Sequence, residues 1–138
     1  MSDTSDGAKA VARAFYESYN DKDMDVSFDR YIDVKLTNHA LGGVFDRDAW
    51  KAFEKTFFAA FVDISLTVFD QVAEGDKVAT RFALGGTQVG EFAGVASAGV
   101  TAELTATAVD RVQDGKIVEH WSELDFTGFL SKLGTPAA

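Results

Sequence analysis

Two histidines are the side chains of this sequence that could take up and release a proton near neutral pH. The imidazole of His39 could remove a proton from the carbon next to a carbonyl group. Tyr16, Tyr19, Asn38 or His120 could then donate a hydrogen bond to the enolate oxygen that forms. These residue types predict acid–base chemistry with His39 as the base and without a cofactor. The alternative interpretation is that Asn38 and His39 only satisfy backbone groups of a loop.

The second histidine lies in a predicted hairpin of residues 101–112 and 116–123, which would turn His120 toward the core. A type I turn followed by a bulged glycine would place Ala108 opposite His120 and Asp110 diagonal to it. Asp110 could then orient the imidazole, as carboxylates do for catalytic histidines. The alternative is that His120 is a hydrogen-bonded core residue and that Asp110 lies at the wet rim.

The other face of this hairpin carries Arg111, Glu119 and Trp121. Arg111 and Glu119 form a diagonal pair that contributes little if it is exposed to water. Trp121 is a large apolar group for a surface position, and such residues are typical of subunit contacts. We therefore expect a homodimer that forms through the outer face of the sheet.

The elements that must position these residues begin with helices. Apolar residues at helical spacing predict a helix over residues 8–20 and a short one that begins after Asp23 and ends near Ile32. A third helix would be capped by Asp46 or Asp48. It carries an aromatic stripe on one face: Trp50, Phe53, Phe57 and Phe61. Such a stripe usually belongs to the core, but it can also form the wall of a cavity.

After the third helix the apolar period changes to two, which predicts strands. A first hairpin turns at Glu74-Gly75-Asp76, and four glycines then suggest bulges and curvature: Gly85, Gly86, Gly90 and Gly94. After the last hairpin, Asp125 would cap a short helix that ends before Gly134. The order of elements predicts an α+β fold with three helices in the N-terminal half, an antiparallel sheet and a short C-terminal helix.

The chain length of 138 residues fits one domain. We expect this domain to cover residues 8–134, with residues 1–7 as a disordered tail and residues 135–138 as a second tail. The net charge of −9 would repel phosphate backbones and anionic lipids, so neither nucleic acid nor a membrane is an expected partner.

Cysteine is absent, which excludes disulfides and thiolate chemistry. The two histidines have no carboxylate at a characteristic ligand spacing, so no metal site is expected. The first residues lack the basic and apolar regions of a signal peptide, and we therefore expect a cytoplasmic location.

Several pieces of sequence, in this order and spacing, carry a family resemblance: Phe15-Tyr16-Glu17 with Asn20 and Asp23, Asn38-His39, Val72-Ala73-Glu74-Gly75-Asp76-Lys77-Val78-Ala79, Gly86-Thr87 with Gly90-Glu91-Phe92, and Asp114-Gly115-Lys116-Ile117-Val118-Glu119-His120-Trp121. Over residues 9–134 the chain resembles the SnoaL-like polyketide cyclase family of the nuclear transport factor 2-like superfamily. The resemblance implies a cone of curved sheet closed by three helices, an apolar pocket inside the cone, and dimers formed through the sheet.

The resemblance also shows where this chain departs from its family. In the cyclases an acid–base aspartate follows the His-Trp pair of the last strand, and this chain has Ser122 there. A partner histidine or aspartate on the preceding strand is replaced by Ala108. The related ketosteroid isomerases carry an oxyanion-holding tyrosine where this chain has Phe15, and their base aligns with His39. The resemblance therefore implies that the usual cyclase pair is missing and that His39 keeps an altered isomerase role.

Together these features predict an enzyme of the polyketide cyclase or ketosteroid isomerase type that acts on a small apolar carbonyl compound in an internal pocket. The predicted catalytic residues are His39, Tyr16, His120 and Asp110. The predicted substrate contacts are Phe15, Tyr19, Asn38, Trp50, Phe53, Phe57, Phe92 and Ser122. An alternative is a protein of the same fold that binds a small molecule without converting it. A third interpretation is a pocket filled by its own side chains, namely Phe53, Phe57 and Phe92.

Overall fold

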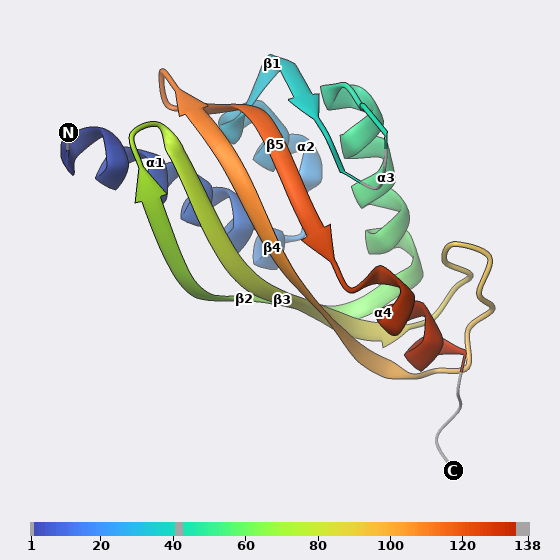
Figure 1. Cartoon of the computed structure of the whole chain (residues 1–138). Helices are drawn as coiled ribbons and strands as arrows, with labels where there is room; N and C mark the ends of the chain where they lie inside the picture. Colours follow the sequence, from blue (N-terminus) through green and yellow to red (C-terminus); the bar gives the residue numbers. More distant parts are fainter. Residues whose placement is uncertain (1, 41–42, 135–138) are drawn as a thin grey trace.

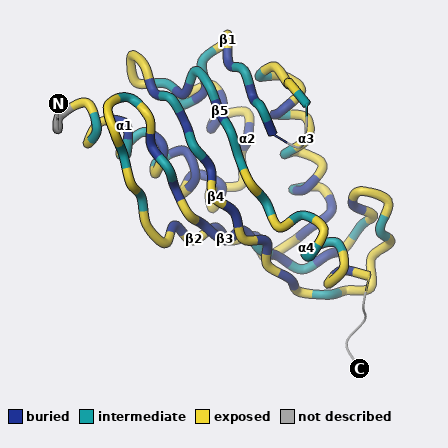
Figure 2. Tube along the Cα trace, in the orientation of Figure 1, coloured by how far each residue is buried: buried dark blue, intermediate teal, exposed yellow. Residues whose placement is uncertain are grey.

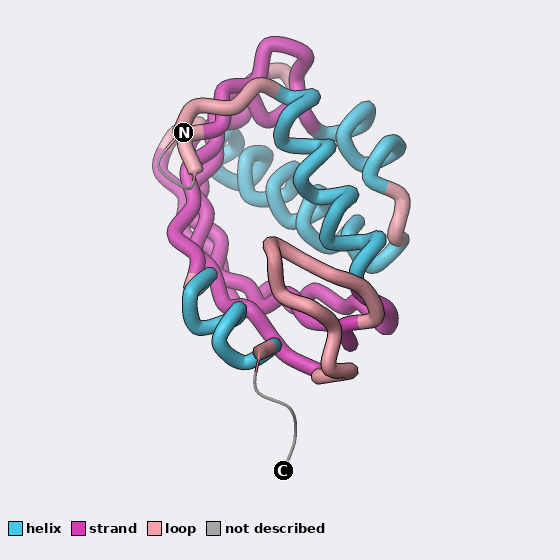
Figure 3. The backbone as a smooth tube through the Cα atoms, turned by 90° about the vertical axis from the view of Figure 1, so that its right-hand side faces the viewer, coloured by secondary structure: helices cyan, strands magenta, loops and turns pink. Residues whose placement is uncertain are grey.

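Within residues 2–40 and 43–134, which the computed structural model describes, five strands form one curved, unclosed sheet in the order β1-β5-β4-β3-β2 (Figure 1). The strands are β1 (Ile32–Asn38), β2 (Phe61–Glu74), β3 (Lys77–Gln88), β4 (Thr101–Gln113) and β5 (Lys116–Leu124). The helices are α1 (Ser2–Glu17), η1 (Ser18–Asp21), α2 (Met24–Tyr31), α3 (Arg47–Ala60) and α4 (Phe126–Leu133). Seen from the side, α1, α2 and α3 lie on one side of the sheet (Figure 3). The predicted α+β fold is confirmed.

Helix α1 packs on β2 and β3 through buried residues one turn apart, including Ala12 and Tyr16. It begins at Ser2, earlier than expected, so the predicted loose end over residues 1–7 is helical from Ser2 onward. The apolar stripe does not reveal this start because the residues before it are polar or small. The tail expected over residues 135–138 lies outside the described part of the chain.

Aspartates begin the three later α-helices. Asp23 accepts a hydrogen bond from the backbone N–H of Val26, and Asp46 accepts one at 2.8 Å from the third residue after it. Asp125 caps α4 in the same way. These side chains satisfy N–H groups that have no partner inside the helix. The predicted caps are confirmed, and of the two candidates for α3 the cap is Asp46 rather than Asp48.

Strand β1 departs from the expected antiparallel pattern. It pairs with β5 in parallel, which places Asn38 beside His120, whereas the other neighbouring strands are antiparallel. No short turn connects β1 to β5, so residue patterns carry no information about their relative direction. The pairing brings β1 to the edge of the sheet next to α3.

The turn between β4 and β5 differs from the predicted type and changes the register. Asp114 and Gly115 both have positive φ, at 52° and 78°, which is typical of a two-residue type I′ turn. A β-bulge near Val118 then shifts the pairing. Asp110 therefore stands directly opposite His120, not diagonal to it. The predicted register was wrong, but Asp110 and His120 do share the buried face of the sheet.

Strand β3 approaches β2 closely at Gly86. A Cβ atom there would lie 3.0 Å from the carbonyl oxygen of Val62, which is tighter than side chains normally allow. The β2–β3 register shifts after Val62, so the sheet is irregular at this close approach. Gly90 and Gly94 belong to the connection between β3 and β4 rather than to a strand.

The core lies between the helices and the inner face of the sheet. Along β4, buried residues alternate with exposed or half-buried ones, and β3 follows the same pattern except at residues 82–84, which are all buried; Figure 2 draws buried residues in dark blue, half-buried ones in teal and exposed ones in yellow. This alternation is typical of an antiparallel sheet with one face on the core and the other turned outward. None of the described helices has both the length and the apolar character that a membrane span requires.

Candidate functional site

A cavity of about 300 Å³ lies between the inner face of the sheet and the helices α1, α3 and α4. This volume is at the lower end of the range of small-molecule sites, roughly 300 to 1,000 Å³. Its polar lining comes from six residues: Tyr16, Tyr19, Asn38, Glu54, His120 and Ser122. The rest of its wall is apolar and mostly aromatic: Ala40, Phe45, Ala49, Trp50, Phe53, Phe57, Phe82, Leu84, Phe92, Leu104, Leu124, Phe126 and Phe129.

At the wall of this cavity, three side chains from three elements form one hydrogen-bonded cluster. Asp110 of β4 lies with its Oδ1 2.6 Å from Nδ1 of His120 on β5. The hydroxyl of Tyr16 on α1 donates to Oδ2 of the same carboxylate at 2.6 Å. Exposed fractions are 0% for Asp110, 1% for Tyr16 and 4% for His120. Such short bonds to a buried carboxylate are charge-assisted and hold the imidazole in one orientation.

These contacts determine which ring nitrogen of His120 is free. Asp110 only accepts hydrogen bonds, so Nδ1 carries the hydrogen that it donates to the carboxylate. In the part of the chain that the structure describes, Nε2 has no hydrogen-bond partner. In the neutral ring Nε2 is then an acceptor, and His120 lines the cavity. Burial, and next the charge of Asp110, raise the pKa of Tyr16 well above its usual value, so its hydroxyl stays a donor.

Trp50 connects this cluster to a second polar group. Its ring stacks on the imidazole of His120, with centroids 4.3 Å apart and planes 24° apart. Its Nε1 donates a hydrogen bond to Oε1 of Glu54, one turn later on α3, at 3.0 Å. The indole therefore restricts the imidazole on one face and holds the Glu54 carboxyl at its edge.

Glu54 is the functional candidate that the sequence analysis missed. Burial raises the pKa of its carboxyl above the usual value, although hydrogen bonds from Trp50 and Tyr19 and the charge of His120 oppose this shift. Burial and the charge of Glu54 raise the pKa of the Tyr19 hydroxyl. One signal in the sequence could have identified Glu54. It lies four residues after Trp50, inside the aromatic stripe, where a charged residue is unusual.

Most of the predicted site residues do meet at the cavity. Nine of them line it: Tyr16, Tyr19, Asn38, Trp50, Phe53, Phe57, Phe92, His120 and Ser122. Asp110 stands behind His120 and contacts it. Phe53, Phe57 and Phe92 form part of the wall around the cavity, so the interpretation that they fill it does not hold.

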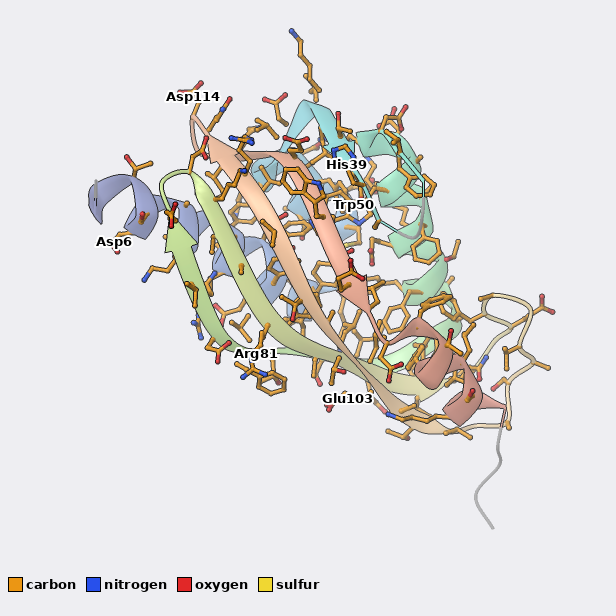
Figure 4. All side chains as sticks on the ribbon, viewed as in Figure 1. Asp6, His39, Trp50, Arg81, Glu103 and Asp114 are labelled. Carbon is orange, nitrogen blue, oxygen red and sulfur yellow. The ribbon has the colours of Figure 1, made fainter. Side chains whose placement is uncertain are left out.

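His39 lies on the other side of the sheet, and its predicted place in the pocket was wrong. Side chains alternate along a strand, and because Asn38 points to the cavity its neighbour points away. The His39 ring stacks on Trp121 at 5.2 Å, and its Nε2 lies 2.8 Å from Oε2 of Glu119. Its side chain is 32% exposed. His39 and Trp50 are both labelled in Figure 4.

Phe15 is also absent from the cavity wall, contrary to its predicted substrate contact. It is fully buried and packs against other aromatic rings, among them Phe28 and Trp50. On a helix, neighbouring residues point about 100° apart, so the turn that presents Tyr16 to the cavity directs Phe15 into the core. Phe15 therefore packs against Trp50 without reaching the cavity.

The outer face of the sheet carries a chain of charged groups beside Trp121. Arg111 lies directly opposite Glu119 and donates to it at 3.3 Å, and it also reaches Asp76. Hydrogen bonds from His39, and to a lesser degree from Arg111, lower the pKa of Glu119. Nζ of Lys77 lies 5.9 Å from the centroid of the Trp121 ring. Across the described residues, no three His, Asp or Glu side chains gather in a way that could hold a metal ion.

A curved sheet with helices on its inner face and an aromatic cavity that contains acid–base groups defines the nuclear transport factor 2-like class of folds. Within this class, the family model for SnoaL-like polyketide cyclases matches residues 9–133, and the chain belongs to that family. A search of curated proteins finds no match.

Solved structures agree with this assignment. The chain is similar to IdmH from Streptomyces antibioticus, a proposed polyketide cyclase, with 33% identity and a TM-score of 0.81 over 93% of this chain and 99% of that one. It is similar to AclR from Streptomyces galilaeus, a proposed hydroxylase, with 26% identity and a TM-score of 0.83 over 92% and 95% of the two chains. It is also similar to TsrD from Streptomyces laurentii, with 25% identity and a TM-score of 0.81 over 93% and 95%.

Proposed function

We propose that this protein is a cofactor-independent acid–base enzyme of the polyketide cyclase type, with His120 as its base and a small apolar carbonyl compound as its substrate. The observation that carries the proposal is the cluster of Asp110, His120 and Tyr16 at the wall of an aromatic cavity, with Nε2 of His120 unpaired among the described residues. An oriented imidazole of this kind is a common general base.

The departures from the family pattern fit this assignment. The usual acid–base positions of the cyclases hold Ser122 and Ala108, which stand opposite each other on β5 and β4. Asp110 and His120 form the next inward-facing pair of the same two strands. An acid–base pair is therefore retained in this chain, two residues along the ladder from its usual place.

In the proposed reaction, Nε2 of His120 removes a proton from the carbon next to the carbonyl group. The electron pair of that C–H bond forms a C=C bond, and the carbonyl π electrons move to oxygen, which gives an enolate. Asp110 stabilises the imidazolium that forms, and Tyr16 holds Asp110 in place by hydrogen bonding. The enolate carbon can then attack a second carbonyl group of the same molecule, which closes a ring, or it can take back a proton at another position.

The first test needs no knowledge of the natural substrate. 2-Tetralone is a bicyclic, apolar ketone with acidic protons next to its carbonyl group, and proton NMR in D₂O follows their exchange for deuterium. We expect the protein to accelerate this exchange, because the first step of the proposed reaction is removal of such a proton. If the protein instead binds 2-naphthol, a stable mimic of the enol, and causes no exchange, the alternative of a non-catalytic binding protein is correct.

We also propose a homodimer formed through the outer face of the sheet. Trp121, stacked on His39 and flanked by Lys77, is a large aromatic group of this face. Aromatic residues of this kind are enriched at subunit contacts. Sedimentation velocity at micromolar concentration should give about twice the chain mass of 14.9 kDa, and Trp121→Glu should shift the protein to the monomer. A monomeric wild-type protein would contradict the proposal.

A further inference from the structure

The proposed reaction needs a hydrogen donor for the oxygen on which negative charge develops. Tyr16 does not meet this need, because its hydroxyl already donates to Asp110 at 2.6 Å. The imidazole of His120 has its one hydrogen on Nδ1, directed at the same carboxylate. The two cluster residues that line the cavity, Tyr16 and His120, therefore both donate their hydrogens to Asp110 and have none available for a substrate oxygen. The donor must come from another part of the cavity wall.

We propose that the Glu54 carboxyl is the general acid of this site and donates its proton to the carbonyl oxygen of the substrate while His120 removes the proton from the neighbouring carbon. The inference rests on the proposed function and adds a second catalytic residue to it. It also specifies the substrate as a neutral ketone that enolises with its oxygen toward α3.

The first support is position. Glu54 lines the same cavity as His120, and Trp50 contacts both, with its ring stacked on the imidazole and its Nε1–H directed at the carboxyl. The imidazole thus lies on one face of the indole, and the carboxyl lies at its Nε1 edge. A carbonyl group and its neighbouring C–H could reach both at once.

The second support is the chemical state of the carboxyl. Glu54 forms no ion pair with Lys or Arg within the part of the chain that the structure describes. Burial raises the pKa of its carboxyl, which favours the protonated form that an acid requires. The titratable groups that act on it are Tyr19 from η1 and His120 from β5. Oε1 accepts a hydrogen bond from Trp50, so in the protonated form Oε2 carries the proton, and Tyr19 is the other group that hydrogen-bonds the carboxyl.

The proton balance is complete with these two residues. The C–H pair forms the C=C bond of an enol, its proton goes to Nε2 of His120, and the oxygen takes the proton of Glu54. The products of this step are a neutral enol, an imidazolium next to Asp110 and a carboxylate at Glu54 that accepts from Trp50. Reversal of the same transfers at a second carbon or oxygen restores both residues.

Glu54→Gln tests the inference, because the amide keeps the shape of the side chain and can donate a hydrogen bond but has no acidic proton. We expect kcat/KM for exchange of 2-tetralone to fall by about 10²-fold. In the wild type, kcat/KM should decline as the pH rises through the pKa of Glu54, because the acid loses its proton. In Glu54→Gln this decline should disappear. The matched control is Glu74→Gln, an exposed residue at the end of β2, which should behave like the wild type.

A second measurement detects the protonation state of the Glu54 carboxyl without any substrate. The infrared difference spectrum between the wild type and Glu54→Gln in D₂O should contain the C=O stretch of a protonated carboxylic acid at the acidic end of the activity profile. Wild-type exchange together with an unchanged rate and pH profile in Glu54→Gln would overturn the inference, as would the absence of that band. If the wild type shows no exchange, or if replacing His120 has no effect, the proposed function itself fails. Circular dichroism confirms that each variant is folded.

Discussion

Replacement of His120 by glutamine is expected to reduce the rate of 2-tetralone exchange by roughly 10²- to 10⁴-fold, the usual contribution of a positioned general base. Glutamine offers an N–H to Asp110, but its amide cannot take a proton from carbon. The effect should appear in kcat, because the apolar wall that binds the ketone remains. Exchange followed by NMR at several ketone concentrations separates kcat from KM.

The chain provides its own control for this experiment. It has two histidines, and His39 lies on the outer face of the sheet with Glu119 and Trp121. His39→Gln makes the same chemical change at a site outside the cavity, so we expect exchange within about twofold of the wild type. Equal losses in the two variants, or a loss in His39→Gln alone, would contradict the assignment of His120 as the base.

Asp110→Asn is expected to have the second largest effect, again on the order of 10²- to 10⁴-fold. The carboxylate accepts from both Nδ1 of His120 and the hydroxyl of Tyr16, whereas an amide has only one accepting oxygen. With its NH₂ group toward Nδ1, the amide would place the ring hydrogen on Nε2 and remove the base from the cavity. Exchange of 2-tetralone by the purified variant measures the loss.

A structural role for Asp110 alone would give a different result. Asp110 is fully buried, so the variant could lose stability, and denaturant unfolding monitors this separately. Asp70→Asn is the matched control, because Asp70 is an exposed partner of Arg81 and such pairs contribute about 0 to 1 kcal/mol. A stably folded Asp110→Asn protein with wild-type exchange would show that the carboxylate does not orient the base.

Much of the fold could be predicted from local patterns. The helix caps at Asp23, Asp46 and Asp125 depend on short-range hydrogen bonds that residue types alone indicate. The face that holds Asp110 and His120 follows from alternation along the strands. Their direct pairing did not follow, because the Asp114-Gly115 turn admits two geometries and the bulge after it has no sequence signal.

Local sequence patterns also left part of the candidate site unpredicted. The resemblance to the isomerases aligns His39 with their base, but one residue along a strand reverses the direction of a side chain, and Asn38 holds the inward position. The aromatic stripe on α3 predicts either core or cavity wall, and neither interpretation points to the carboxyl of Glu54 within it. A carboxyl that faces a cavity becomes visible once the sheet and helix are placed against each other, since long-range packing determines which side of the helix is enclosed.

The protonation of the His120 ring is the most direct test of the account. In the His39→Gln variant His120 is the remaining histidine, so ¹⁵N NMR of the labelled ring reports its two nitrogens without ambiguity. We expect the neutral ring to carry its hydrogen on Nδ1, next to Asp110, with Nε2 unprotonated and able to accept a proton from substrate. A neutral ring with its hydrogen on Nε2 would contradict the account, because the nitrogen proposed to take the substrate proton could not act as a base.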